Sequence, residues 1–226
     1  KFLSKNKNYE EAAKVRDQIG KIKYITQPIT PVSYFLKNPN LLDDIRQNEL
    51  KELSLFLSNF IGVPKSLSRI ECFDVAHLSG TKPTASMVTF VNGEPDKSLY
   101  RQFRIYQKKT RSDTDSMAEV ASRRLRHLND WGKPDLIIVD GGKAQVSVFR
   151  KNFEKANILI VGLAKSDERI VIPVDNRNLS THSFVEKVVP RGPARNLVQR
   201  LRDEAHRFAR KYHHKLIQKT LGQASS

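Results

Sequence analysis

Hydrophobic residues recur at intervals of three and four along two stretches near the start of the chain, which is the spacing of one buried helix face. Residues 8–24 and residues 41–60 both show this pattern, and Pro64 ends the second stretch. The apolar side of the second stretch is made by Leu50, Leu53, Leu57 and Phe60. Residues 26–34, between the two stretches, contain two prolines, which favour a linker. The pattern therefore predicts a helix, a linker and a second helix.

From residue 69 the pattern changes to short apolar and alternating runs that are typical of β-strands. Strands are predicted over 69–78, over two runs within 84–106 that flank the turn signal Asn92-Gly93, and over 134–140, 158–164 and 169–174. Helices are predicted over 116–131, 143–156 and 193–221, and a loop over 175–193. This order predicts an α/β fold with a mixed sheet and flanking helices, preceded by a short helical segment. The ribonuclease H fold has the same order, although the order alone does not establish it.

The chain carries a large excess of positive charge, because 40 Lys and Arg residues face 24 Asp and Glu residues and give a net charge of +16. Such a charge indicates a polyanionic partner, with nucleic acid as the first candidate, although ribosomal and membrane-surface proteins share it. Three basic stretches suit contacts with phosphates: 108–111, 123–126 and 207–219. Any one of them alone is more often a solvated surface.

The cysteine content and the hydropathy pattern exclude several classes of protein. Cys72 is the only cysteine, so neither an internal disulfide nor a cysteine-based zinc cluster can form. A reducing compartment, the cytoplasm, is therefore expected. No apolar run approaches the length of a membrane span, so no membrane association is expected. The sequence starts at Lys1 without a signal peptide, and we expect a piece of a longer protein.

Two aspartates stand where the predicted sheet could hold a reactive site. Asp74 lies inside the apolar run 69–78, and a carboxylate buried in a strand needs a partner or a metal ion. Asp140 ends the central strand 134–140 and precedes two glycines, and open α/β sheets place their sites at such strand ends. For both residues the alternative is turn chemistry at a strand end.

A third acidic position precedes the helix predicted over 116–131. Asp115 is placed like an N-cap, with Glu119 four residues on, whereas Asp113 is freer to bind a ligand. Carboxylates on separate elements, without cysteine, favour hard divalent ions held by oxygen. Paired Mg²⁺ or Mn²⁺ ions can activate water for phosphodiester hydrolysis, so a nuclease is indicated.

Residues 203–206 spell Asp-Glu-Ala-His, the letters of a helicase box. A nucleotide-driven motor also needs the loop G-x-x-x-x-G-K-[ST], which the sequence lacks, so no nucleotide cofactor is expected. The apolar spacing places 202–210 in a helix, whereas the helicase box ends a strand. On that helix His206 could face the sheet as a general base or metal ligand, with a surface histidine as the equal alternative.

Five segments together run over most of residues 50–216: RIECFDVAHLSGTKPTASMVTFVNGEPDKSLYRQFRI, DTDSMAEVASRRLRHL, PDLIIVDGGKAQ, VGLAKSDERI and RDEAHRFARKYHHKL. They resemble the endonuclease half of UvrC, the incision subunit of bacterial nucleotide excision repair. The segment KNYEEAAKVRDQI resembles the UVR motif, through which UvrC proteins bind UvrB. The resemblance implies a ribonuclease H-like endonuclease that cuts the damaged strand of double-stranded DNA on the 5′ side of the lesion.

The resemblance also implies site residues. The catalytic positions of the family fall on Asp74, Asp113, Asp140 and His206, with Mg²⁺ or Mn²⁺ held by Asp74, Asp140 and His206. Apart from the resemblance, the basic character of the chain predicts DNA contacts from Arg123, Arg124, Lys143, Arg207 and Lys211. Contacts with UvrB are expected from Tyr9, Ala12, Ala13, Arg16 and Ile19.

The expected organisation is a UVR-like segment over 1–30, a helical linker region over 31–66, a nuclease domain over 67–221 and a tail over 222–226. No part of the sequence resembles the GIY-YIG nuclease or the helix-hairpin-helix pair of full-length UvrC proteins. Residues 175–193 fit the family poorly, so the loop before the last helix is expected to differ in shape. A catalytically weak scaffold that binds DNA and UvrB, and a ribonuclease H acting on RNA–DNA hybrids, are the alternatives.

Overall fold

The computed structural model describes residues 40–64, 66–76, 84–105, 113–164, 168–174 and 183–223. For Val75, Ala76, Asp113 and residues 213–223 it describes the backbone only. The predicted helix over 8–24, the linker over 26–34, the basic stretch 108–111 and the residues expected to bind UvrB lie outside the described residues. Residues 1–42 and 43–226 form separate compact units, and the sheet lies wholly in the second.

The described strands form one mixed sheet, as the sequence predicts. They are β1 (Arg69–Ala76), β2 (Thr84–Val91), β3 (Glu94–Pro95), β4 (Arg101–Arg104), β5 (Leu136–Asp140), β6 (Leu159–Ala164), β7 (Arg169–Val174) and β8 (Ser183–Val188). Their order is β3-β2-β1-β5-β6-β7-β8, and β4 also pairs with β2. The β1–β5 and β5–β6 pairs are parallel and the other pairs are antiparallel.

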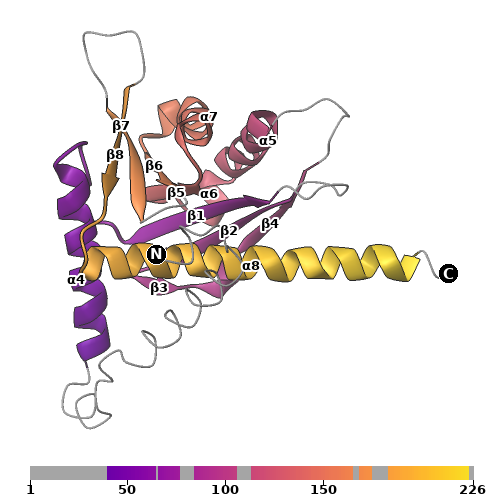
Figure 1. Cartoon of the computed structure of the whole chain (residues 1–226), viewed down its shortest axis with the longest axis horizontal. Coiled ribbons are helices and arrows are strands. Elements are labelled where there is room, and N and C mark those ends of the chain that lie inside the picture. Colours follow the sequence, from indigo (N-terminus) through magenta and orange to yellow (C-terminus); the bar gives the residue numbers. More distant parts are fainter. Residues whose placement is uncertain are drawn as a thin grey trace, which may run out of the picture. The chain divides into compact units, whose positions relative to one another are not determined.

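Helices cover both faces of the sheet because its strands are apolar on both sides. The helices are α4 (Leu41–Ser58), α5 (Asp113–Arg126), α6 (Leu128–Trp131), α7 (Lys143–Phe153) and α8 (Pro193–Gln223). One face carries Phe73, Met87 and Val139 and packs with α5 and α7, while the other packs with α4 and α8 (Figure 1). The leucines of α4 therefore belong to the same core as the sheet. None of the described helices is both long enough and apolar enough to cross a bilayer.

The prediction of a loop over 175–193 is wrong at the centre of this range, where β8 pairs antiparallel with β7. This strand lies at the edge of the sheet, and its residues are half-buried or exposed along its whole length. An edge strand with neither face fully covered lacks the alternation of buried apolar residues that marks an inner strand. The hydrophobic pattern therefore gave no signal for it.

Two predicted boundaries also shift. The helix expected from residue 116 begins at Asp113, so Asp115 lies in its first turn and not at its N-cap. After the Asn92-Gly93 turn, β3 holds only two residues, because Pro95 cannot donate to the ladder and Asp96 then caps a short 3₁₀ turn. The chain returns as β4 to the same side of β2.

Candidate active site

Asp74 and Asp140 lie at the same end of two neighbouring parallel strands. Phe73 pairs with Val139 in the register of β1 and β5, and the two aspartates are the next residues along each strand. Side chains alternate along a strand, so both carboxylates point away from Phe73 and Val139, towards the face that α8 covers. Their side chains are only 10% and 7% exposed. The fold thus brings two nearly buried carboxylates together at the carboxyl ends of the central strands.

His206 reaches these carboxylates from α8. Ala205 and Ala209 are buried against the sheet on either side of it, and their small side chains let the helix lie close to β1 and β2. His206 Nδ1 lies 2.8 Å from Asp74 Oδ2, and Nε2 lies 3.8 Å from Asp140 Oδ2. The three side chains offer ligand atoms that all lie within 4.8 Å of one another. Since 45% of the His206 side chain is exposed, the cluster is open to solvent on the histidine side.

Ion pairs fix the position of α8 beside the cluster. Arg202, one turn before His206, places Nη2 2.5 Å from Oε1 of the buried Glu168, which follows β6 with a left-handed backbone of φ 48°. Glu204 accepts a hydrogen bond of 2.8 Å from the Tyr100 hydroxyl and another of 2.7 Å from Arg207. The hydrogen bonds from Arg207 and Tyr100 lower the pKa of Glu204 below its usual range. Residues 202–210 are helical, as predicted, and Arg202 and Glu204 anchor this helix to Glu168 and Tyr100.

The electrostatic character of the site is visible at Cys72, two residues before Asp74 on the same side of β1. Burial raises the pKa of the Cys72 thiol well above its usual value, and the negative charges of Asp140 and then Asp74 raise it further. Arg202 acts in the opposite direction. The carboxylates therefore create a negative potential at this end of the sheet, which favours a bound cation.

The Gly141-Gly142 turn after Asp140 is held by close packing. The Gly141 amide donates to the Leu163 carbonyl at 3.1 Å, and the Gly142 amide donates to Gln145 Oε1 at 3.0 Å. A Cβ added at Gly162 would lie only 2.6 Å from the Gly141 carbonyl oxygen. The glycines let β5, β6 and the start of α7 approach closely, and this fixes the strand end that carries Asp140.

Arg124 is buried within the fold, which corrects the expectation that it contacts DNA. It is fully buried, and its guanidinium donates two hydrogen bonds of 2.7 Å to Glu71 and others to the carbonyls of His127 and Gly132. Arg124 lies seven residues after the buried Met117, on the inner face of α5, a spacing that could have revealed its orientation. Its role is to tie α5 to β1.

The other predicted DNA contacts lie at the surface. Lys143, Arg207 and Lys211 are exposed, although Lys143 lies 3.3 Å from Glu186 and Arg207 pairs with Glu204. Arg123 is 30% exposed and donates to the Arg104 carbonyl at 2.7 Å. Asp113 starts α5, but its side chain lies outside the described ones. Sequence reasoning missed Glu168 and Tyr100, because each lies within a segment that resembles the family but neither stands at a catalytic position of that resemblance.

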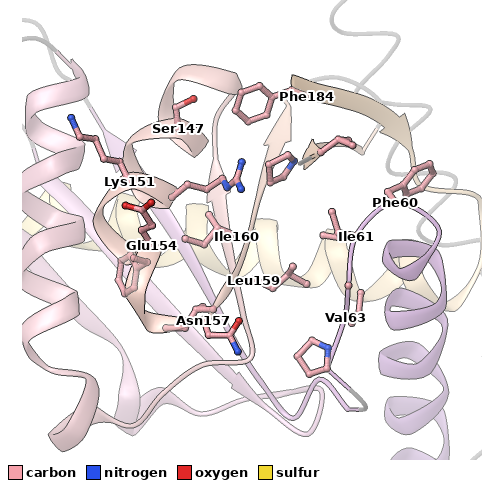
Figure 2. A pocket seen from close by; sticks show the side chains of 17 residues that line it. Phe60, Ile61, Val63, Ser147, Lys151, Glu154, Asn157, Leu159, Ile160 and Phe184 are labelled. Atoms are coloured by element: carbon pink, nitrogen blue, oxygen red, sulfur yellow. The ribbon is translucent and has the colours of Figure 1, made fainter. Parts of the chain in front are cut away.

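The structure also contains a pocket of about 1400 Å³, whose lining side chains are shown in Figure 2. It is lined by residues that include Phe60, Ile61, Val63, Ser147, Lys151, Glu154, Asn157, Leu159, Ile160 and Phe184. Leu159 is the first residue of β6 and Asp140 is the last of β5, and these strands are parallel. The pocket therefore opens at the opposite end of the strands from Asp140, and it is not where the candidate chemistry lies.

A mixed sheet of this order, with carboxylates at the ends of its central strands and a histidine from the last helix, defines a ribonuclease H-like domain. Residues 58–209 match the family model of the UvrC RNase H endonuclease domain, and residues 1–25 match that of the UvrB/UvrC motif. The chain belongs to the UvrC family.

Curated relatives support the same assignment. UvrABC system protein C of Methanospirillum hungatei is 43% identical over 156 residues, covering 67% of this chain and 29% of that protein. The same protein of Methanococcus maripaludis is 35% identical over 227 residues, covering 97% and 39%. The chain therefore spans about a third of the length of the curated relatives it matches. The crystal structure of human ENDOV aligns with a TM-score of 0.39 at 11% identity, covering 75% of this chain and 99% of that chain.

Proposed function

We propose that this chain is the divalent-metal-dependent endonuclease part of a UvrC-like protein and cuts the damaged DNA strand on the 5′ side of a lesion. The observation that carries the proposal is the cluster of Asp74, Asp140 and His206 at the carboxyl ends of the central strands. The net charge of +16 supports a nucleic acid substrate, and the family membership supports repair as the context. A protein that acts on this DNA substrate is expected in the cytoplasm.

The donor set of the cluster fits Mg²⁺ or Mn²⁺. Two carboxylates are the usual protein ligands of Mg²⁺, which keeps several waters, and Mn²⁺ also prefers oxygen ligands. Asp74 and Asp140 would hold the ion, and Asp113 would support the site. When bound, the ion supplies an activated water and stabilises the negative charge that develops on the phosphate.

His206 is oriented by Asp74 for one of two tasks. Its Nδ1 contacts Asp74 Oδ2 at 2.8 Å, so Nε2 is the ring atom that can bind the ion or exchange a proton with the DNA. The contact with Asp74 also fixes the ring in one orientation, which both tasks require. His206 is therefore either the third ligand or the proton-transfer group of the reaction.

Exposed cations near the cluster would contact the DNA backbone. Arg207 follows His206 directly on α8, Lys211 comes about one turn later, and Lys143 starts α7 beside the Asp140 turn. Arg123 would contribute from α5. Residues 1–30 would bind UvrB, as their match to the UvrB/UvrC motif suggests. The substrate in this proposal is damaged duplex DNA presented by UvrB.

The test is incision of a damaged, 5′-labelled duplex in the presence of UvrB and Mn²⁺. Asp74→Asn keeps the size of the side chain and removes its charge, so it should abolish the 5′ cut while DNA binding and UvrB binding stay intact. Asp44→Asn, the same chemical change at an exposed aspartate of α4, is the matched control. Normal incision by Asp74→Asn would overturn the proposal. Absence of incision by the unmodified protein, with UvrB bound, would favour the scaffold function.

A further inference from the structure

Ser86 is a polar side chain beside the candidate active site that neither the motifs nor the proposed chemistry has used. It lies on β2 directly opposite Asp74 in the antiparallel register of β1 and β2. Residues directly opposite in such a pair point to the same face, with Cβ atoms about 4.5–5.5 Å apart. The Ser86 and Asp74 side chains are therefore neighbours on the face from which His206 approaches.

The Ser86 hydroxyl is buried without a hydrogen bond to the described residues. The residue is 1% exposed, and among the described residues its Oγ has no hydrogen-bond partner. Val88 and Phe90, which follow on the same side of β2, belong to the apolar core. A buried hydroxyl without a partner costs free energy of folding, and an alanine at this position would avoid that cost.

We propose that Ser86 is a positioning residue for the metal site, whose hydroxyl donates a hydrogen bond to the Asp74 carboxylate when a divalent cation is bound there. His206 engages Asp74 through Oδ2, so this carboxylate has to serve the histidine and the ion together. A second hydrogen bond from a rigid strand restricts its rotation and reduces the entropy that cation binding would cost. This inference rests on the proposed function, because it assumes that Asp74 binds the ion.

The test compares Mn²⁺ affinity with metal-free stability in Ser86→Ala. The dissociation constant for Mn²⁺, measured by the electron paramagnetic resonance signal of free Mn²⁺, should rise roughly 10-fold. The unfolding midpoint in EDTA should stay the same or rise, because a methyl group replaces a hydroxyl without a partner. A role limited to holding the fold together would instead lower the midpoint.

Thr89→Val is the matched control. Thr89 is a fully buried hydroxyl residue on the same strand, but it is three positions away and so faces the other side of the sheet, where its Oγ1 lies 3.4 Å from the Leu99 carbonyl. Its Mn²⁺ affinity should match the unmodified protein. An unchanged affinity in Ser86→Ala, or a loss of metal-free stability there, would overturn the Ser86 inference alone. If the unmodified protein binds no Mn²⁺, or if Asp74→Asn binds it equally well, the proposed function fails as well.

Discussion

Breaking the buried ion pair of Glu71 and Arg124 tests the fold and the corrected role of Arg124 together. Both side chains are fully buried, and two hydrogen bonds of 2.7 Å join them. Removing one partner of a buried pair costs about 3–5 kcal/mol, because the other charge is left without compensation. In Arg124→Met, Glu71 keeps Arg69 at 3.0 Å, so we expect the lower value, about 3 kcal/mol. In Glu71→Gln both arginines lose their carboxylate, so we expect about 5 kcal/mol.

The assay is denaturant and thermal unfolding of the two variants, with Arg126→Met as the control on the same helix. Arg126 is exposed, so its replacement should change the free energy of unfolding by less than about 0.5 kcal/mol. A domain of this size loses about 2–4 °C of melting temperature per kcal/mol, so Arg124→Met should melt about 6–12 °C lower. If Arg124→Met is as stable as Arg126→Met and binds DNA more weakly, the reasoning is refuted and Arg124 is a DNA contact.

Three further predictions concern the elements that hold the site. Glu168→Gln should lower the free energy of unfolding by about 2 kcal/mol and reduce incision, because Arg202 loses its charged partner on α8; unfolding and incision assays check this. Gly162→Ala should cost about 1–3 kcal/mol in the same unfolding assay, because its Cβ would lie 2.6 Å from a backbone oxygen, whereas Gly62→Ala, with no atom within 4 Å, should not. Because the pKa of Glu204 is lowered in the folded protein, its ionised form stabilises the fold at pH values above the ordinary glutamate pKa of about 4.3. This stability is lost as the pH falls below that value, so the free energy of unfolding should decrease less with falling pH in Glu204→Gln than in the unmodified protein.

The strand ends of the site could be predicted because local signals were strong there. Asp140 ends a fully apolar run and precedes two glycines, and Asp74 interrupts another apolar run, so each stood out from its neighbours. That the two residues would be neighbours depends on the pairing of β1 with β5 across more than sixty positions of sequence, which no local pattern contains. The resemblance to a known family supplied that link.

Helix orientation was harder to predict. The spacing of apolar residues places His206 between the buried Ala205 and the exposed Arg207, so the pattern left its direction open. Arg124 was assigned to DNA because three arginines in four positions look like a basic patch. The helical period that begins at Met117 places only the middle one of them inward, towards Glu71. A charged residue on an apolar helix face indicates a buried partner elsewhere in the chain, which the sequence does not name.

The most direct test of the metal site is a crystal of the protein soaked in Mn²⁺, with anomalous scattering used to locate the ions. The account predicts an anomalous peak within bonding distance of the carboxylates of Asp74 and Asp140, with His206 beside it, and no such peak in crystals of Asp74→Asn. Mn²⁺ bound only at other positions, with the Asp74 and Asp140 carboxylates unligated, would contradict it.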